Sequence, residues 1–162
     1  MQSIFNVPIL DSDLSRCFDS LSSRGYVRLM LTGRCLCGAV RYEIEGSVRH
    51  ITHCHCQMCR KAHGAAFATY APLARRRFRL TNGADQLRSY RSSEHVTRQS
   101  CGVCGSQLFW LDEKHPEIIS VTLGTVDGDP GGRPEAHIYA KHRACWYEIS
   151  DGLPQYDEEV AR

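Results

Sequence analysis

Residues 35–38 read CLCG and residues 101–105 read CGVCG, two short cysteine pairs that lie far apart in the chain. Structural zinc takes four ligands in a tetrahedron, and two closely spaced thiol pairs on separate loops supply them. The glycine after each pair can turn the chain with positive φ, so that backbone N–H groups point at the sulfur atoms. We therefore predict a closed structural zinc site that ties the two segments together. Its ligands are Cys35, Cys37, Cys101 and Cys104; the alternative is two pairs buried by packing alone.

A second cysteine cluster occupies residues 53–59, which read HCHCQMC. Cys54 and Cys56 are two residues apart, so in an extended segment they face the same side, and Cys59 follows as the chain turns. Three thiolates can thus converge on one metal with no obvious fourth ligand, the usual arrangement of a catalytic zinc with an open position. We predict a second zinc here, with Cys54, Cys56 and Cys59 as catalytic residues. Zinc binds thiols readily and deprotonates them, so the expected chemistry is activation or release of a thiol.

Basic residues surround this second cluster. Arg60 and Lys61 are candidates to bind substrate carboxylates, with His55 as a third ligand-binding residue. His53, His55 and His63 could relay protons. Either His53 or His55 could instead be the fourth metal ligand, which would make a second structural site.

Composition limits the alternatives. The chain has 162 residues, enough for one domain, with 42% hydrophobic residues and a net charge of +2 from 20 basic and 18 acidic residues. This balance gives no sign of nucleic-acid or membrane partners, and the basic run at 75–77 reads as a charged loop. No secretory signal or transmembrane stretch is evident, so the nine cysteines of a chain expected to be cytoplasmic indicate metal binding rather than disulfides. Cys56 and Cys59 could form a redox dithiol, but the surrounding sequence shows no βαβ pattern, and the third cysteine counts against it. Cys17 and Cys145 have no neighbouring cysteine and are expected to be ordinary thiols.

The pattern of residues after Gly33 predicts many short strands and little helix. The expected strands are residues 39–44, 48–52, 66–70, 78–80, 87–90, 96–100, 107–111 and 118–123, with one or two helical turns over 57–64 closed by Gly64. Turn signals at 82–83 and 127–132 separate them. We expect a mainly β, strongly curled sheet fold in the domain 33–156. Residues 1–32 form an N-terminal extension with a short amphipathic turn within 11–24, and residues 157–162 a tail.

Four segments, in order, resemble the glutathione-dependent formaldehyde-activating enzyme family, which includes centromere protein V and has the fold called Mss4-like. The segments are GRCLCGAVRYE (33–43), HCHCQMCRKAHG (53–64), RQSCGVCGSQLF (98–109) and HIYAKHRACWYEISDGLPQY (137–156). The resemblance implies a bent β-sheet fold with a structural zinc on the first and third segments. It also implies a second, catalytic zinc at Cys54, Cys56 and Cys59 that engages the thiol of glutathione.

The family's named reaction joins glutathione and formaldehyde to give S-(hydroxymethyl)glutathione, and is classed as a carbon–sulfur lyase reaction. The resemblance therefore implies a small thiol substrate such as glutathione. One departure is Ala144-Cys145 before Trp146, where the family tends to have a small residue and proline. The competing hypothesis is a non-catalytic zinc module that binds a thiol ligand or a protein partner. Chromatin association would rest on the centromere relative alone, and the near-neutral charge counts against it.

Overall fold

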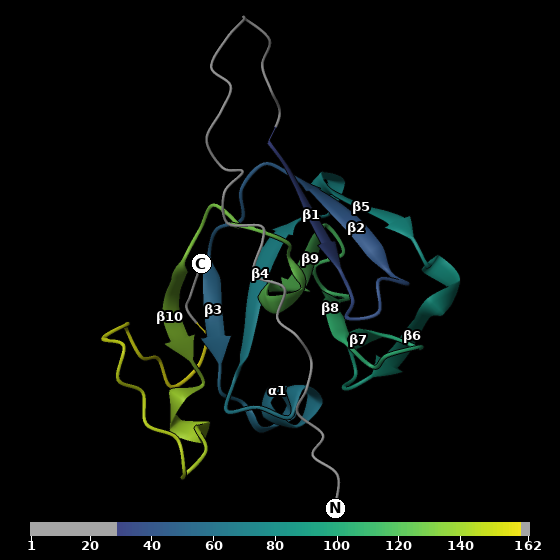
Figure 1. Ribbon diagram of the computed structural model, residues 1–162. Coiled ribbons are helices and arrows are strands. Elements are labelled where there is room, and N and C mark those ends of the chain that lie inside the picture. Colours follow the sequence, from purple (N-terminus) through teal and green to yellow (C-terminus); the bar gives the residue numbers. More distant parts are fainter. Residues whose placement is uncertain (1–28, 160–162) are drawn as a thin grey trace, which may run out of the picture.

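The structure is a computed structural model in which residues 29–159 are described (Figure 1). Within this range the chain forms ten strands, one α-helix and four short 3-10 turns. The strands are β1 (Met30–Arg34), β2 (Arg41–Glu45), β3 (Ile51–Cys54), β4 (Ala68–Ala74), β5 (Phe78–Asn82), β6 (Leu87–Arg91), β7 (Val96–Cys101), β8 (Gln107–Asp112), β9 (Ile118–Thr122) and β10 (Pro134–Ile138). The helix α1 covers Gln57–His63, and the 3-10 turns are Arg75–Arg77, Ala84–Gln86, Leu123–Thr125 and Ala140–His142.

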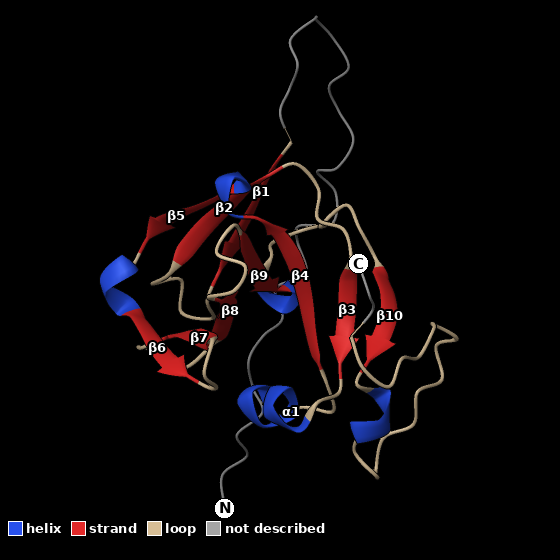
Figure 2. Cartoon of the chain, turned by 180° about the vertical axis from the view of Figure 1, so that it is seen from behind, coloured by secondary structure: helices blue, strands red, loops and turns tan. Residues whose placement is uncertain are grey.

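Two sheets make up the fold (Figure 2). A small antiparallel sheet has the order β1-β2-β5, and a curled seven-stranded sheet has the order β10-β3-β4-β9-β8-β7-β6. Within these sheets, β10 against β3 is a parallel pair, and the other pairs are antiparallel. The mainly β fold with bent sheets and few short helices is confirmed.

The core lies between the two sheets. Tyr42 of β2 is 1% exposed, and its ring packs against Phe78 of β5 and Phe109 of β8, with centroids 5.5 and 5.3 Å away. The Tyr42 hydroxyl finds a partner in the Thr125 hydroxyl at 2.8 Å, so this buried polar group is satisfied. Aliphatic residues of β2, β3, β8 and β9 complete the core. Alternate residues of β1 and β2 are buried, which agrees with the period-two alternation of residues 39–44.

Most of the predicted strands coincide with observed ones to within a few residues. The prediction for 48–52 was partly wrong, because β3 begins only at Ile51. His50 has a φ of 57°, a left-handed conformation that a strand cannot continue through, and its N–H donates to Glu135. The strand β1 pairs along its whole length with β2, which places residues 30–32 in a sheet rather than in an extension. The predicted turn within 11–24 and Cys17 lie outside the described residues.

The helix α1 ends as predicted, at Gly64 with φ 58°. It lies below the ends of β3 and β4, at the foot of the large sheet in Figure 1. In the described part of the chain, no helix is long and apolar enough to cross a membrane.

Candidate metal centres and their surroundings

The four-cysteine group joins the two sheets. Cys35 and Cys37 lie in the turn between β1 and β2, while Cys101 ends β7 and Cys104 follows in the turn before β8. Their Sγ atoms all lie within 4.8 Å of one another. The sequence-predicted ligands are therefore together, although they come from segments 64 residues apart.

The spacing of these sulfur atoms fits zinc. Tetrahedral Zn–S bonds of about 2.3 Å require sulfurs about 3.8 Å apart. Cys35 Sγ lies 3.5 Å from Cys37 Sγ, which lies 3.8 Å from Cys101 Sγ. Gly38 and Gly105 have φ of 74° and 78°, the left-handed turns that the sequence indicated. Cys35 Sγ accepts a hydrogen bond from Val40 N–H at 3.3 Å, as expected of a thiolate. This group can hold a structural metal with no position left for substrate.

The three-cysteine group is formed where β3 passes into α1. Cys54 is the last residue of β3, Cys56 is the N-cap of α1, and Cys59 lies in the first turn, where its N–H donates to Cys56 Sγ at 3.3 Å. The three Sγ atoms lie within 4.8 Å of one another. Hydrogen bonds from Cys54 and Cys59 lower the pKa of Cys56, so the group favours the charged form of at least one thiol.

No fourth ligand joins this group among residues 29–159. His53 Nδ1 lies 2.8 Å from the Thr69 hydroxyl, and His55 Nε2 lies 2.8 Å from His137 Nδ1. Both imidazoles thus have other hydrogen-bond partners, and neither joins the three thiols as a metal ligand. The donor set suits a divalent metal with an open position rather than a closed Cys3His shell.

A buried chain of polar groups runs behind the three cysteines, and sequence reasoning missed it. His55 and His137 are both fully buried, and His137 Nε2 lies 2.9 Å from an Asp151 carboxylate oxygen. Burial and the neighbouring His137 lower the pKa of His55 to about 4, so its ring is neutral at pH 7. Asp151 lies in the loop after β10, so these contacts connect that loop to β10 and to the segment between β3 and α1.

A second chain of hydrogen bonds reaches Cys59 itself. Arg98 of β7 is 7% exposed and donates to Cys59 Sγ at 3.6 Å and to the Tyr70 hydroxyl at 2.9 Å. Tyr70 in turn lies 2.9 Å from His63 Nε2. Burial, and then the charge of Arg98, lower the pKa of His63 to about 4. His63 was predicted beside the site, whereas Arg98 and Tyr70 carry no local signal in the sequence.

A pocket of about 260 Å³ lies beside α1. Arg60 and Lys61 line it, together with Trp146 from the distant loop after β10. Trp146 is 71% exposed, and Arg60 Nε is buried without a hydrogen-bond partner among the described residues. The two predicted carboxylate-binding residues therefore share one pocket, and His55 lies elsewhere, in the buried chain with His137.

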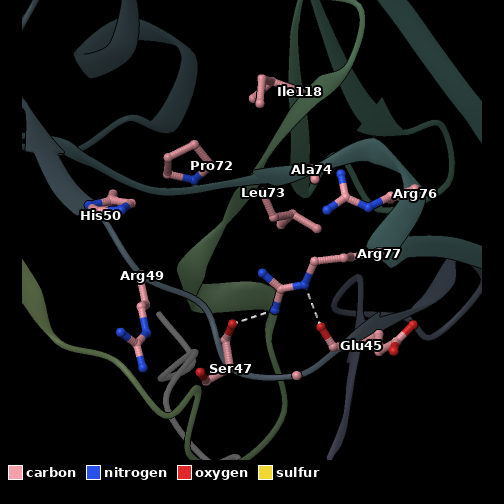
Figure 3. Close-up of a pocket in the computed structure, with 11 residues that line it drawn as sticks. Glu45, Ser47, Arg49, His50, Pro72, Leu73, Ala74, Arg76, Arg77 and Ile118 are labelled. Atoms are coloured by element: carbon pink, nitrogen blue, oxygen red, sulfur yellow. Dashed lines mark hydrogen bonds between the residues drawn. The ribbon is translucent and has the colours of Figure 1, made fainter. Parts of the chain in front are cut away.

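A larger cavity, of about 770 Å³, lies at the opposite end of β4 (Figure 3). Since β4 spans seven residues, it is about 20 Å from the end that pairs with Cys54. Arg77 is fixed there by hydrogen bonds to the carbonyls of Glu45 and Ser47, while Arg76 lines the opening. The basic run predicted as a charged loop is thus a 3-10 turn that connects β4 of the large sheet to β5 of the small sheet.

Comparison with known proteins follows the same segments. A sequence profile of the family described as "Glutathione-dependent formaldehyde-activating enzyme" matches residues 30–142. A curated protein of Halomonas elongata named "Putative glutathione-dependent formaldehyde-activating enzyme" is 27% identical over 128 residues, covering 75% of this chain and 82% of its own. A crystal structure of a Rhodobacter sphaeroides protein matches with a TM-score of 0.54 at 21% identity, covering 77% of this chain and 98% of that one. That structure shares the fold.

Proposed function

The chain belongs to the glutathione-dependent formaldehyde-activating enzyme family, and we propose that it is a zinc-dependent enzyme of the carbon–sulfur lyase type. Its substrates are a small thiol, glutathione in the first place, and formaldehyde or a related small aldehyde. The single observation that carries this proposal is the convergence of Cys54, Cys56 and Cys59 without a fourth described ligand, one helical turn from a pocket with two cations. The free thiols of both groups suit a reducing compartment, so the proposal includes a cytoplasmic location.

The division of labour between the two cysteine groups is part of the proposal. Cys35, Cys37, Cys101 and Cys104 would hold one zinc that stabilises the fold, and Cys54, Cys56 and Cys59 would hold a second. A zinc in the second group would supply thiol activation, because a thiol that coordinates zinc loses its proton. The substrate donor is expected to be sulfur, since three thiolates make a poor Lewis acid for water but leave zinc able to take a soft ligand.

Arg60 and Lys61 would orient the thiol substrate. Glutathione carries two carboxylates, and a guanidinium can bind one of them through two parallel hydrogen bonds. The unpartnered Arg60 Nε is a donor that such a carboxylate would satisfy. Trp146 offers an apolar surface beside these charges for the body of the ligand. Binding through the carboxylates would hold the ligand's thiol near the cysteine group and so reduce the entropy lost in the reaction.

The overall reaction adds the thiol across the aldehyde carbonyl. An S–C bond forms, the C=O π bond breaks, and the proton lost by sulfur is replaced by one on the new hydroxyl oxygen, so no oxidant or reductant is required. His53 and His63 are the candidates for proton transfer, because burial lowers the pKa of both imidazoles and keeps them neutral at pH 7.

The test is exchange between free formaldehyde and its glutathione adduct, followed by NMR on fully metallated protein. The wild type and Cys145→Ser, which changes an exposed thiol outside both groups, should accelerate exchange, and Cys56→Ser should not. An exchange rate in the wild type equal to the uncatalysed rate would refute the formaldehyde reaction. Retained binding of glutathione without exchange would then point to the non-catalytic thiol-binding module.

Arg60→Gln separates substrate orientation from the chemistry. It should raise KM for glutathione about tenfold or more, because a charge-assisted pair with a carboxylate is lost. The same variant should react normally with 2-mercaptoethanol, a thiol that has no carboxylate. Equal effects on the two thiols would contradict the assignment of Arg60.

A further inference from the structure

Arg98 is a buried cation that forms no ion pair with a carboxylate in the part of the chain that the structure describes. It comes from the middle of β7 and is 7% exposed. Its Nε donates to the Ser92 hydroxyl at 3.2 Å and its Nη1 to the Tyr70 hydroxyl at 2.9 Å. Its Nη2 points at Cys59 Sγ at 3.6 Å. Within residues 29–159, no carboxylate forms an ion pair with it.

A buried guanidinium requires a counter-charge, since removing an unpaired ion from water costs several kcal/mol. The nearest groups that can carry negative charge are the thiols of Cys59 and Cys56 and the Tyr70 hydroxyl. Burial raises the pKa of Tyr70, which keeps that hydroxyl neutral. The cysteine group is therefore the anion that Arg98 faces.

The charges of the loaded group add up simply. Three thiolates and a divalent ion carry a net charge of −1, and Arg98 brings the sum to zero. With an additional anionic ligand the net charge of the site would be −2 without Arg98 but only −1 with it. The attraction between unit charges a few ångström apart is large in a partly buried site, so this difference should decide which ligands the open position accepts.

We propose that Arg98 is a positioning residue that acts through Cys59 as the fixed counter-charge of the three-cysteine group, and that it selects anionic sulfur ligands over neutral ones. This inference rests on the proposed binding of a thiol at that group. Tyr70 and Ser92 hold the guanidinium in place, and His63 holds Tyr70 through its hydroxyl. The His63–Tyr70–Arg98 chain thereby connects α1, β4 and β7 to one sulfur atom.

The experiment compares two ligands on the cobalt-loaded full-length protein, whose visible absorption reports the ligand that occupies the open position. Glutathione serves as the anionic probe and imidazole as the neutral one. The variants are Arg98→Met, Arg98→Lys and the control Arg79→Met, which removes the same charge from an exposed ion pair on the small sheet. Loading is verified for each protein before titration.

We expect Arg98→Met to weaken glutathione binding at least about tenfold, which is about 1.4 kcal/mol, and to change imidazole binding by less than about twofold. Arg98→Lys should keep the ratio of the two affinities within about threefold of the wild type, because the charge remains. Arg79→Met should match the wild type. A purely structural role would weaken both ligands alike, and that outcome overturns the proposal.

If Arg98→Met does not fold, Arg98→Lys decides the matter, since a loss of thiol preference in a variant that keeps the charge would equally overturn it. Failure of the proposed function would look different. A wild type that binds glutathione in an Arg98-dependent manner but leaves formaldehyde exchange unaccelerated would refute the enzyme and preserve the counter-charge. Accelerated exchange with unchanged ligand preference in Arg98→Met would do the reverse.

Discussion

Replacing one ligand in each cysteine group should have unequal effects on stability. Cys101→Ser removes a metal ligand and so breaks a cross-link between segments that are 64 residues apart in sequence. The cross-link model assigns about 4 kcal/mol to closing a loop of that length, and only about 2 kcal/mol to the six-residue loop between Cys54 and Cys59. Because a domain is stable by about 5–15 kcal/mol in total, the first loss removes much of it.

The assay is urea unfolding of zinc-loaded protein, followed by tryptophan fluorescence. Trp110 lies in β8 opposite Arg98 of β7, and Trp146 lines the pocket beside α1, so the two probes report the large sheet and the loop after β10. Cys101→Ser should unfold at much lower urea than the wild type or fail to fold, whereas Cys56→Ser should shift the midpoint by about half as much or less. Cys145→Ser is the matched control, an exposed free thiol outside both groups. Equal destabilisation by Cys56→Ser and Cys101→Ser would refute the division into a structural and a reactive group.

Three further outcomes follow from the same contacts. A chelator should remove metal first from the three-cysteine group while far-UV circular dichroism stays native, since only the four-cysteine group is closed; simultaneous loss of both metals and of structure would contradict this. The pKa of His63 lies near 4 in the folded protein against 6.5 for the free side chain, so between these values the unfolded chain binds the extra proton and stability falls as pH falls. His63→Gln should reduce that loss by about 1 kcal/mol at pH 5 after allowance for partial exposure, measured by urea unfolding at pH 7 and 5, and an unchanged pH dependence would speak against it. Asp151→Ala leaves His137 Nε2 buried without its partner, so it should lower the free energy of unfolding by about 1–3 kcal/mol and speed amide exchange in the loop after β10. Asp151→Asn keeps an acceptor and should lower the free energy of unfolding less. Identical losses in the two variants would show that the acceptor is not what matters.

The local signals in the sequence located what local physics determines. Alternation placed β2, because one of its faces is buried against the core, whereas short runs between turn signals placed β5 to β9. The positive φ of Gly38 and Gly105 followed from the need to turn a backbone toward sulfur. Spacing on one turn brought out Cys54, Cys56 and Cys59, whereas the two distant pairs were joined by the need of a structural zinc for four ligands.

What the sequence could not show depends on pairing between distant segments. The strand β10 begins with Pro134 and is short, and it is a strand because it lies beside β3, not because of its composition. Arg98 lies between Thr97 and Gln99 in a polar stretch of β7, and no local feature of the sequence distinguishes a buried arginine from an exposed one. The His55–His137–Asp151 chain joins residues up to 96 positions apart in sequence (151 minus 55), so only the fold brings it together.

The parallel pairing of β10 with β3 has a consequence for how the chain is made. As synthesis proceeds from the N-terminus, all four ligands of the first cysteine group are available once residue 104 has emerged, so a metal there could tie the β1–β2 turn to β7 before β8 and β9 are made. The strand that carries Cys54 gains its second neighbour only when residues 134–138 arrive, and the segment at Pro154–Tyr156 that bonds to His137 comes later still. The four-cysteine group can therefore bind metal before the three-cysteine group gains its neighbours from residues 134–156. A nascent chain would thus pass through a stage in which the first cysteine group is complete but the surroundings of the second are not.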